Sequence, residues 1–121
     1  METSKTDSAA VDNRSEAIAV LNDAFRRAPL PHLGKVVMTH GVAALAYIDR
    51  MKVLAFVHHF KAFTPDNDPY GEHDFGAFEY DGNRYFWKID YYDASYESGS
   101  PDPGNVELTQ RVLTVMFASE Y

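Results

Sequence analysis

The stretch from residue 75 to residue 91 constrains the fold most, because a turn sequence lies between two runs rich in aromatic residues. Asp81-Gly82 is typical of a two-residue β-hairpin turn, and Gly82-Asn83 offers an alternative turn one position later. The flanking runs, Phe75–Tyr80 and Arg84–Tyr91, then form two antiparallel strands. Both turns leave the same side chains on each face, since the two registers differ by two residues in pairing. The sequence therefore predicts a hairpin with two defined faces.

Alternation along these strands predicts which side chains are buried. The core face is expected to carry Phe78, Tyr80, Tyr85, Trp87, Ile89 and Tyr91. The other face is mixed and expected to be partly wet, with His73, Phe75, Glu79, Arg84, Phe86, Lys88, Asp90 and Tyr92.

A helix is expected before the hairpin, over Arg14 to Ala28, where apolar residues recur every three or four positions. Asn13 and Glu16 resemble a capping box at its start, and Pro29 ends it. Arg26 and Arg27 lie in its last turn, where cations suit the helix dipole without any ligand.

The remaining apolar stretches are less decisive. Lys35 to Thr39 is predicted to be a strand. Residues 46–60 fit a strand or a helix, and the length without turn residues favours a helix. Residues 110–118 also fit both, and their β-branched content favours a strand. Residues 93–105 have the composition of a loop.

These elements predict an α+β fold, in which two helices pack on an antiparallel sheet of three or four strands with the hairpin at its centre. Residues 1–12 are polar and unpatterned and are expected to form a flexible N-terminal segment, with a single domain over 13–121. The N-terminus has no apolar signal region and no apolar run approaches a membrane span, so a cytoplasmic protein without membrane contact is expected. No cysteine is present, which excludes disulfides, thiolate metal sites and a cysteine nucleophile.

Negative charge is concentrated in the middle of the chain. The whole sequence carries a formal charge of −7, whereas Thr64 to Leu108 holds eleven acidic and two basic residues, a formal charge of −9. The same segment contains ten of the seventeen aromatic residues, so it is not a disordered acidic tail. Direct binding to nucleic acid is not favoured, because phosphate recognition needs a basic surface. An acidic aromatic surface instead suits a partner protein with a basic surface.

The densest group of chemically active residues lies at 66–76, which reads DNDPYGEHDFG. In the hairpin, His73 is expected to pair with Asp90 beside Lys88, and these three are the candidate catalytic residues. Two interpretations stay open: Asp and Asn next to Pro and Gly organise loops through backbone contacts, or the group is a site. The candidate binding residues are Asp66, Asn67, Asp68, Tyr70, Glu72, Asp74, Tyr92 and Asp93.

Several long motifs of the chain resemble the bacterial domain-of-unknown-function family DUF3768. The residues that carry the resemblance are Leu21-Asn22-Asp23 with Arg26-Arg27, Thr39 with Gly41-Val42, the motif at 66–76, the segments 87–93 and 111–114, and Glu120-Tyr121. The resemblance implies a small stand-alone protein, of a kind that many plasmids and other mobile elements carry. It implies no activity, cofactor or catalytic residue.

The function expected from these features is that of a small acidic binding protein rather than an enzyme. We expect a mobile-element accessory or anti-defence protein that docks its acidic aromatic surface on a host or plasmid-encoded protein with a basic, nucleic-acid-binding surface. A homo-oligomer built on the aromatic face is a further option. No cofactor is favoured. The alternative is a metal-dependent hydrolase or nuclease, with a divalent metal held by Asp68, Glu72, His73 and Asp74.

Overall fold

The computed structural model describes the backbone of residues 2–121 and the side chains from residue 13 onward. Its elements, in chain order, are α1 (Glu2–Arg27), β1 (Gly34–Met38), α2 (His40–Ala43), α3 (Tyr47–His58), β2 (Phe75–Tyr80), β3 (Asn83–Tyr92), β4 (Gln110–Phe117) and two short 3-10 helices, η1 (Val106–Leu108) and η2 (Ala118–Glu120). The strands form one sheet in the order β1-β4-β3-β2. The α+β class is therefore as predicted, and the four strands fall within the predicted three or four. The β2–β3 hairpin lies at one edge of the sheet rather than at its centre, because β2 is an outer strand.

The sheet is mixed rather than antiparallel, which corrects the predicted topology. β4 lies between β1 and β3, antiparallel to β3 but parallel to β1. A parallel pair needs a long crossover, and here the chain passes through α2, α3 and the β2–β3 hairpin between the two strands. The short helix α2 was not predicted, so three α-helices pack with the sheet instead of two.

The ambiguous segments were assigned correctly: α3 occupies residues 47–58 and β4 occupies residues 110–117. The start predicted for the first helix was wrong, since α1 begins at Glu2 rather than Arg14. Asn13 therefore lies inside the helix and does not cap it. Extending an existing helix costs little where Pro and Gly are absent, as in residues 2–13. The flexibility expected for residues 1–12 stays a prediction.

The hairpin forms as predicted and uses the Asp81-Gly82 turn, because Tyr80 pairs with Asn83. Both turn residues have positive φ, 52° and 79°, as a two-residue turn of this hand requires. Tyr85, Trp87 and Ile89 are buried, and the other predicted core residues of the hairpin pack against them.

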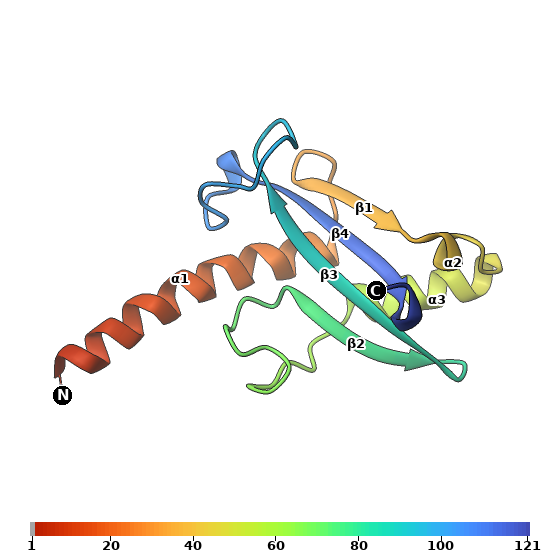
Figure 1. Ribbon diagram of the computed structural model, residues 1–121, viewed down its shortest axis with the longest axis horizontal. Coiled ribbons are helices and arrows are strands. Elements are labelled where there is room, and N and C mark those ends of the chain that lie inside the picture. The colour runs from red at the N-terminus through yellow and green to blue at the C-terminus, as the bar shows by residue number, and fades with distance from the viewer. Residues whose placement is uncertain (1) are drawn as a thin grey trace.

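All three helices cover the same face of the sheet. The core joins Phe25 of α1, Val42 of α2 and Val53 and Val57 of α3 to inward-facing side chains of β3 and β4. Figure 1 shows the first half of α1 projecting past the sheet, while its second half lies against it. Within the described part of the chain, every helix is too short or too polar to cross a lipid bilayer.

Trp87 is the largest side chain of this core and is fully buried. The rings of Phe60 and Phe63 meet it edge-on, with centroids 5.4 and 6.1 Å from that of the indole. The Arg26 guanidinium lies over it at 4.9 Å from the ring centroid. Gly76 faces Trp87 across the hairpin, and a Cβ there would overlap the indole nitrogen. The site thus accepts no side chain at position 76.

Gly76→Ala is expected to destabilise the protein by about 1–3 kcal/mol, the range typical of overpacked cores, because the added Cβ would force the fully buried indole to shift against its neighbours. Urea unfolding followed by tryptophan fluorescence measures the change. Gly99→Ala is the matched control, since its Cβ would meet only the Tyr91 carbonyl oxygen at an ordinary 3.9 Å. Equal midpoints for the two variants would contradict this account of the core.

Candidate functional site

The His73 side chain lies between two carboxylates. Its Nδ1 is 3.1 Å from both carboxylate oxygens of Asp23 on α1, so Nδ1–H donates to that carboxylate. Its Nε2 is 3.6 Å from Oδ2 of Asp68, whose Oδ1 accepts a hydrogen bond from the His73 backbone N–H. The ring stacks on Phe63, with centroids 3.9 Å apart and planes within 1°. His73 is therefore fixed on both edges and on one face.

The predicted pairing of His73 with Asp90 is wrong. His73 has a positive φ of 57°, which ends the alternation of β2 and turns its ring toward the helix-covered side. Asp90 lies between buried Ile89 and core-facing Tyr91 on β3, so it points to the opposite face of the sheet. Its carboxylate is 3.1 Å from the Lys88 ammonium, and both side chains are about 40 % exposed. The three candidate catalytic residues thus do not converge.

The ring of His73 forms part of the wall of a groove of about 560 Å³ between α1 and the loop that precedes β2. Tyr70, at 79 % exposure, is the most open aromatic side chain on its rim. Both imidazole nitrogens face carboxylates, with Nδ1 hydrogen-bonded to Asp23 and Nε2 at a longer 3.6 Å from Asp68. The carboxylates lie on opposite edges of the ring, and among the described side chains no three His, Asp or Glu residues are placed to hold a metal ion. The metal-dependent hydrolase or nuclease stays a prediction, and its expected ligands do not form a metal-binding cluster among the described side chains.

Asn67 and Glu72, two other predicted binding residues, make contacts that hold the loop in place. Asn67 accepts a hydrogen bond from the Thr64 backbone N–H and donates one to the Ala62 carbonyl oxygen. Glu72 accepts a hydrogen bond from the Tyr91 hydroxyl at 2.9 Å. These contacts match the loop-organising interpretation of the motif.

Asp74 is half-buried, and burial raises the pKa of its carboxyl. The neighbouring charges of Glu72, Asp68 and Asp90 raise that pKa further. Its backbone carbonyl oxygen accepts a hydrogen bond from the Ile89 N–H, which extends the hairpin by one pair. The side chain at position 74 therefore carries a charge that the fold disfavours.

A buried polar network connects this loop to the rest of the fold. The Asn22 amide nitrogen on α1 donates to the Glu72 backbone carbonyl at 2.9 Å and to the Tyr91 hydroxyl oxygen at 2.8 Å. The Asn22 carbonyl oxygen accepts a bond of 2.6 Å from Nε of Arg111, and that guanidinium also donates to the Pro103 carbonyl oxygen. Asn22 and Arg111 are almost fully buried. One helix residue and one strand residue thus anchor two loops.

Arg26 has a structural role that its position in the last turn of α1 did not reveal. It is fully buried, pairs with Asp23 at 3.0 Å and donates to the Phe60 carbonyl oxygen at 2.8 Å. Burial lowers the pKa of its guanidinium, and the hydrogen bond to Asp23 acts in the opposite direction. The helix-dipole explanation of Arg26 is therefore incomplete.

Asn22, Asp23, Arg26 and Arg111 were not among the predicted site residues. They are ordinary polar residues in otherwise amphipathic elements, and periodicity treats each as surface. The only signal for them in the sequence was their presence in the motifs that resemble the family.

The loop after β3 is organised by Asp93. Its Oδ1 accepts hydrogen bonds from the backbone N–H groups of Ser95 and Glu97, and these lower the pKa of the carboxyl. Tyr92 lies next to Tyr96, with ring centroids 6.3 Å apart. Of the predicted binding residues, Asp66 and Tyr70 are exposed without such a structural task in the described contacts.

The two loops lie at the same end of the sheet, since β2 starts where β3 finishes: Phe75 pairs with Lys88, four residues before the end of β3. We call this region, residues 64–74 and 93–108, the acidic end. It contains eight Asp and Glu residues and no Lys or Arg. Among the described side chains, the one ion pair that these acids make is that of Asp68 with His73.

The comparisons with known proteins identify the family. The family described as Protein of unknown function (DUF3768) matches residues 38–120, more than half of the chain. The chain belongs to the DUF3768 family. The match includes the acidic end but begins after α1, which supplies Asn22 and Asp23. No curated protein and no solved structure matches the chain.

Family motifs that are distant in the sequence meet at the end of the sheet opposite the acidic end. The Glu120 carboxylate accepts hydrogen bonds from the Thr39 hydroxyl at 2.6 Å and from the Gly41 N–H at 2.8 Å. The Thr39 bond, followed by that of the Phe117 N–H, lowers the pKa of Glu120. A Cβ at Gly41 would lie 2.8 Å from that carboxylate, which explains the glycine. These DUF3768 residues therefore fasten the C-terminus to α2.

Asn22→Ala is expected to destabilise the protein by about 3 kcal/mol or more, because it leaves the buried Arg111 Nε–H and the Glu72 backbone carbonyl oxygen without their partner. Thermal and urea unfolding measure the loss. Asn13→Ala, at an exposed position of the same helix, is the control and is expected to change stability by no more than about 0.5 kcal/mol. A small effect of Asn22→Ala would show that the network is dispensable.

Asp74→Asn is expected to raise the melting temperature at pH 7, since it removes a charge that the fold disfavours. The folded pKa lies above the unfolded value of 3.8, so the destabilisation is complete above the folded pKa and disappears below 3.8. The stabilisation by Asn should shrink accordingly as the pH falls. Asp66→Asn, exposed in the same loop, is the control that removes an equal charge without relieving burial. Stabilisation independent of pH would contradict this account.

Proposed function

We propose that this DUF3768 protein is a non-enzymatic binding protein whose acidic end docks on a basic surface of a partner protein. The observation that carries the proposal is the charge of the acidic end: eight carboxylates and no Lys or Arg on two adjacent loops. Charge of one sign concentrated on one surface steers association with an oppositely charged partner and lowers affinity for nucleic acid.

The buried network supports a binding role because it fixes the backbone of both loops before any partner arrives. Asn22 holds the first loop at Glu72, and Arg111 holds the second at Pro103. A surface that is already ordered loses less conformational entropy on association than flexible loops would. Tyr70, exposed on the first loop, supplies an aromatic contact of the kind enriched at interfaces.

The partner chemistry that fits best is a cluster of Lys and Arg side chains of the kind that binds nucleic-acid phosphates. A protein with this acidic end would cover such a cluster and compete with nucleic acid for it. A role as a mobile-element accessory or anti-defence protein, acting on a host or plasmid-encoded partner, follows from that competition.

The proposal is tested by replacing two exposed acids of the acidic end, Asp66→Asn with Glu107→Gln. Tagged protein captures partners from a bacterial lysate at low salt, and mass spectrometry identifies them. We expect a basic partner whose affinity for the variant falls about tenfold or more at low salt, with the difference shrinking at high salt through screening. Added nucleic acid should release the partner from the captured protein, because the two compete for the same basic surface of the partner.

The matched control removes two acids at the opposite end of the sheet, Glu79→Gln with Asp81→Asn in the hairpin. Both positions are exposed, and the net charge changes by the same amount. Equal losses in the two double variants would indicate a general charge effect and contradict a specific surface. Absence of any basic partner at low salt would contradict the proposal itself.

A further inference from the structure

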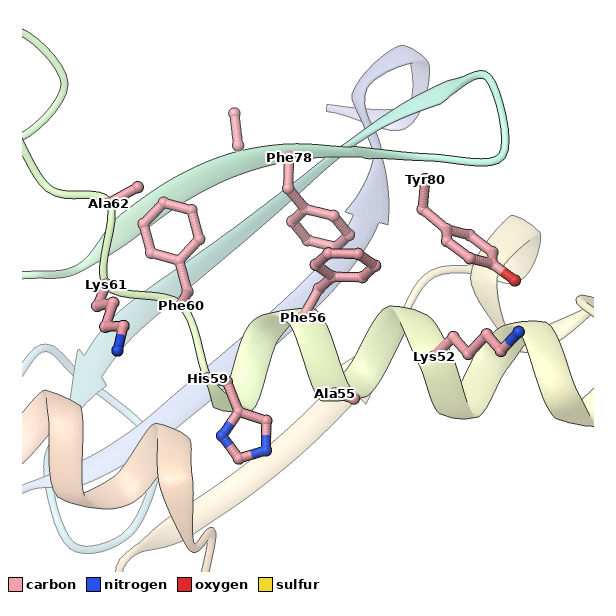
Figure 2. A pocket seen from close by; sticks show the side chains of 10 residues that line it. Lys52, Ala55, Phe56, His59, Phe60, Lys61, Ala62, Phe78 and Tyr80 are labelled. Carbon is pink, nitrogen blue, oxygen red and sulfur yellow. The ribbon is translucent and has the colours of Figure 1, made fainter.

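A large groove lies away from the acidic end, between α3 and the edge strand β2. It is an open groove of about 710 Å³ with an almost entirely apolar lining. Its floor is aromatic: Phe56 of α3 stacks on Phe78 of β2 with ring centroids 5.2 Å apart, and Phe60 lies beside them. Figure 2 shows Phe56 and Phe78 meeting at the middle of the groove. Phe56 is 45 % exposed despite these contacts, so the groove leaves aromatic surface open.

The backbone of β2 is available along this groove. β2 is the last strand of the sheet and pairs only with β3. The Ile89 N–H donates to the Asp74 carbonyl oxygen opposite it, which makes 74/89 a hydrogen-bonded pair of the antiparallel ladder. Alternation then directs the N–H and C=O groups of residues 75, 77 and 79 outward. No backbone partner is found for them in the described structure, so they form a free edge.

The charge around the groove is opposite in sign to that of the acidic end. Lys52, His59 and Lys61 line it, and no Asp or Glu does. Figure 2 shows Lys61 toward one end and Lys52 toward the other, with the aromatic floor between them. Asp49, the acid on α3, is occupied by a hydrogen bond of 2.8 Å from the Tyr80 hydroxyl. An occupant with carboxylates at both ends would therefore meet basic side chains, with no acidic side chain of the groove lining to repel it.

We propose that the groove binds an extended peptide segment of a partner protein, which adds to the free edge of β2 as a further strand. The side chains of the segment that face α3 are apolar at the centre and acidic at either end. The outward N–H and C=O groups of Ala77 and its neighbours would supply the main-chain hydrogen bonds. Phe56 and Phe78 supply the apolar contact, and Lys52 and Lys61 select the acidic ends.

A second copy of the chain fits this groove less well than an acidic peptide. Two copies paired through β2 would bring their Lys52 and Lys61 side chains together, and like charges across an interface oppose association. The site is also independent of the function proposed above, since the acidic end seeks a basic partner and this groove an acidic one.

The probe is a fluorescein-labelled nine-residue peptide with Glu at the second and eighth positions, Leu at the fourth and sixth, and Thr elsewhere. These four residues share one face of an extended chain. Fluorescence anisotropy is expected to show saturable binding to the full chain. Replacement of both Glu by Lys, or N-methylation of the peptide at alternate residues along its pairing edge, is expected to weaken binding about tenfold or more.

Two protein variants test the groove from the other side. Ala77→Pro removes an outward N–H at an edge position where proline is tolerated, and should weaken the same peptide about tenfold. Lys52→Glu with Lys61→Glu should do the same, whereas Lys35→Glu, an exposed lysine on β1, should not. If Ala77→Pro fails to fold, the N-methylated peptide tests strand addition with the protein unchanged.

Absence of saturable binding, or equal affinity for the Glu and Lys peptides, overturns the proposal. Retained affinity for the N-methylated peptide overturns strand addition. A concentration-dependent dimer that Ala77→Pro abolishes identifies a second copy as the occupant and also overturns it. Analytical ultracentrifugation of the wild-type chain and of Ala77→Pro distinguishes that last case.

Discussion

The hydrogen bond between Asn22 and Arg111 is the contact on which the arrangement of this protein most depends. It joins α1 to β4 through two residues 89 positions apart in sequence, at a distance of 2.6 Å and out of contact with water. The Asn22 amide nitrogen also donates to the Glu72 carbonyl and the Tyr91 hydroxyl oxygen, and the Arg111 guanidinium donates to the Pro103 carbonyl. Burying a guanidinium costs free energy unless it is hydrogen-bonded, so helix, strand and both loops must be in place together to accommodate Arg111.

This coupling explains how long loops with high charge keep a defined shape. Residues 59–74 and 93–109 contain little regular structure, and eight carboxylates on them repel one another. The network and the Asp23–His73 contact hold the backbone of the first loop, while Asp93 and Arg111 hold that of the second. The repulsion is therefore balanced by buried hydrogen bonds elsewhere, and four of the eight carboxylates, those of Asp66, Glu97, Asp102 and Glu107, are exposed.

The two proposed surfaces divide the molecule by charge. The acidic end gathers the loops at one end of the sheet, whereas the groove beside β2 is apolar and basic at its rim. The hairpin connects them, since β2 starts at the acidic end and its free edge forms one wall of the groove. A protein with two such surfaces is suited to bring an acidic peptide and a basic protein into one assembly.

The sequence alone determined the hairpin, its buried face and the α+β class, because these depend on local periodicity and turn chemistry, whereas the structure decided between the two possible turns in favour of Asp81-Gly82. The sequence also located the excess of negative charge between Thr64 and Leu108. Only the tertiary structure decided that β1 runs parallel to β4, since pairing between distant strands leaves no local pattern. It also decided that His73 faces Asp23 and Asp68 instead of Asp90: one residue with positive φ ends the strand alternation on which the prediction rested. Only the tertiary structure also revealed the structural roles of Asn22, Arg26 and Arg111, because burial of a polar side chain depends on what packs over it.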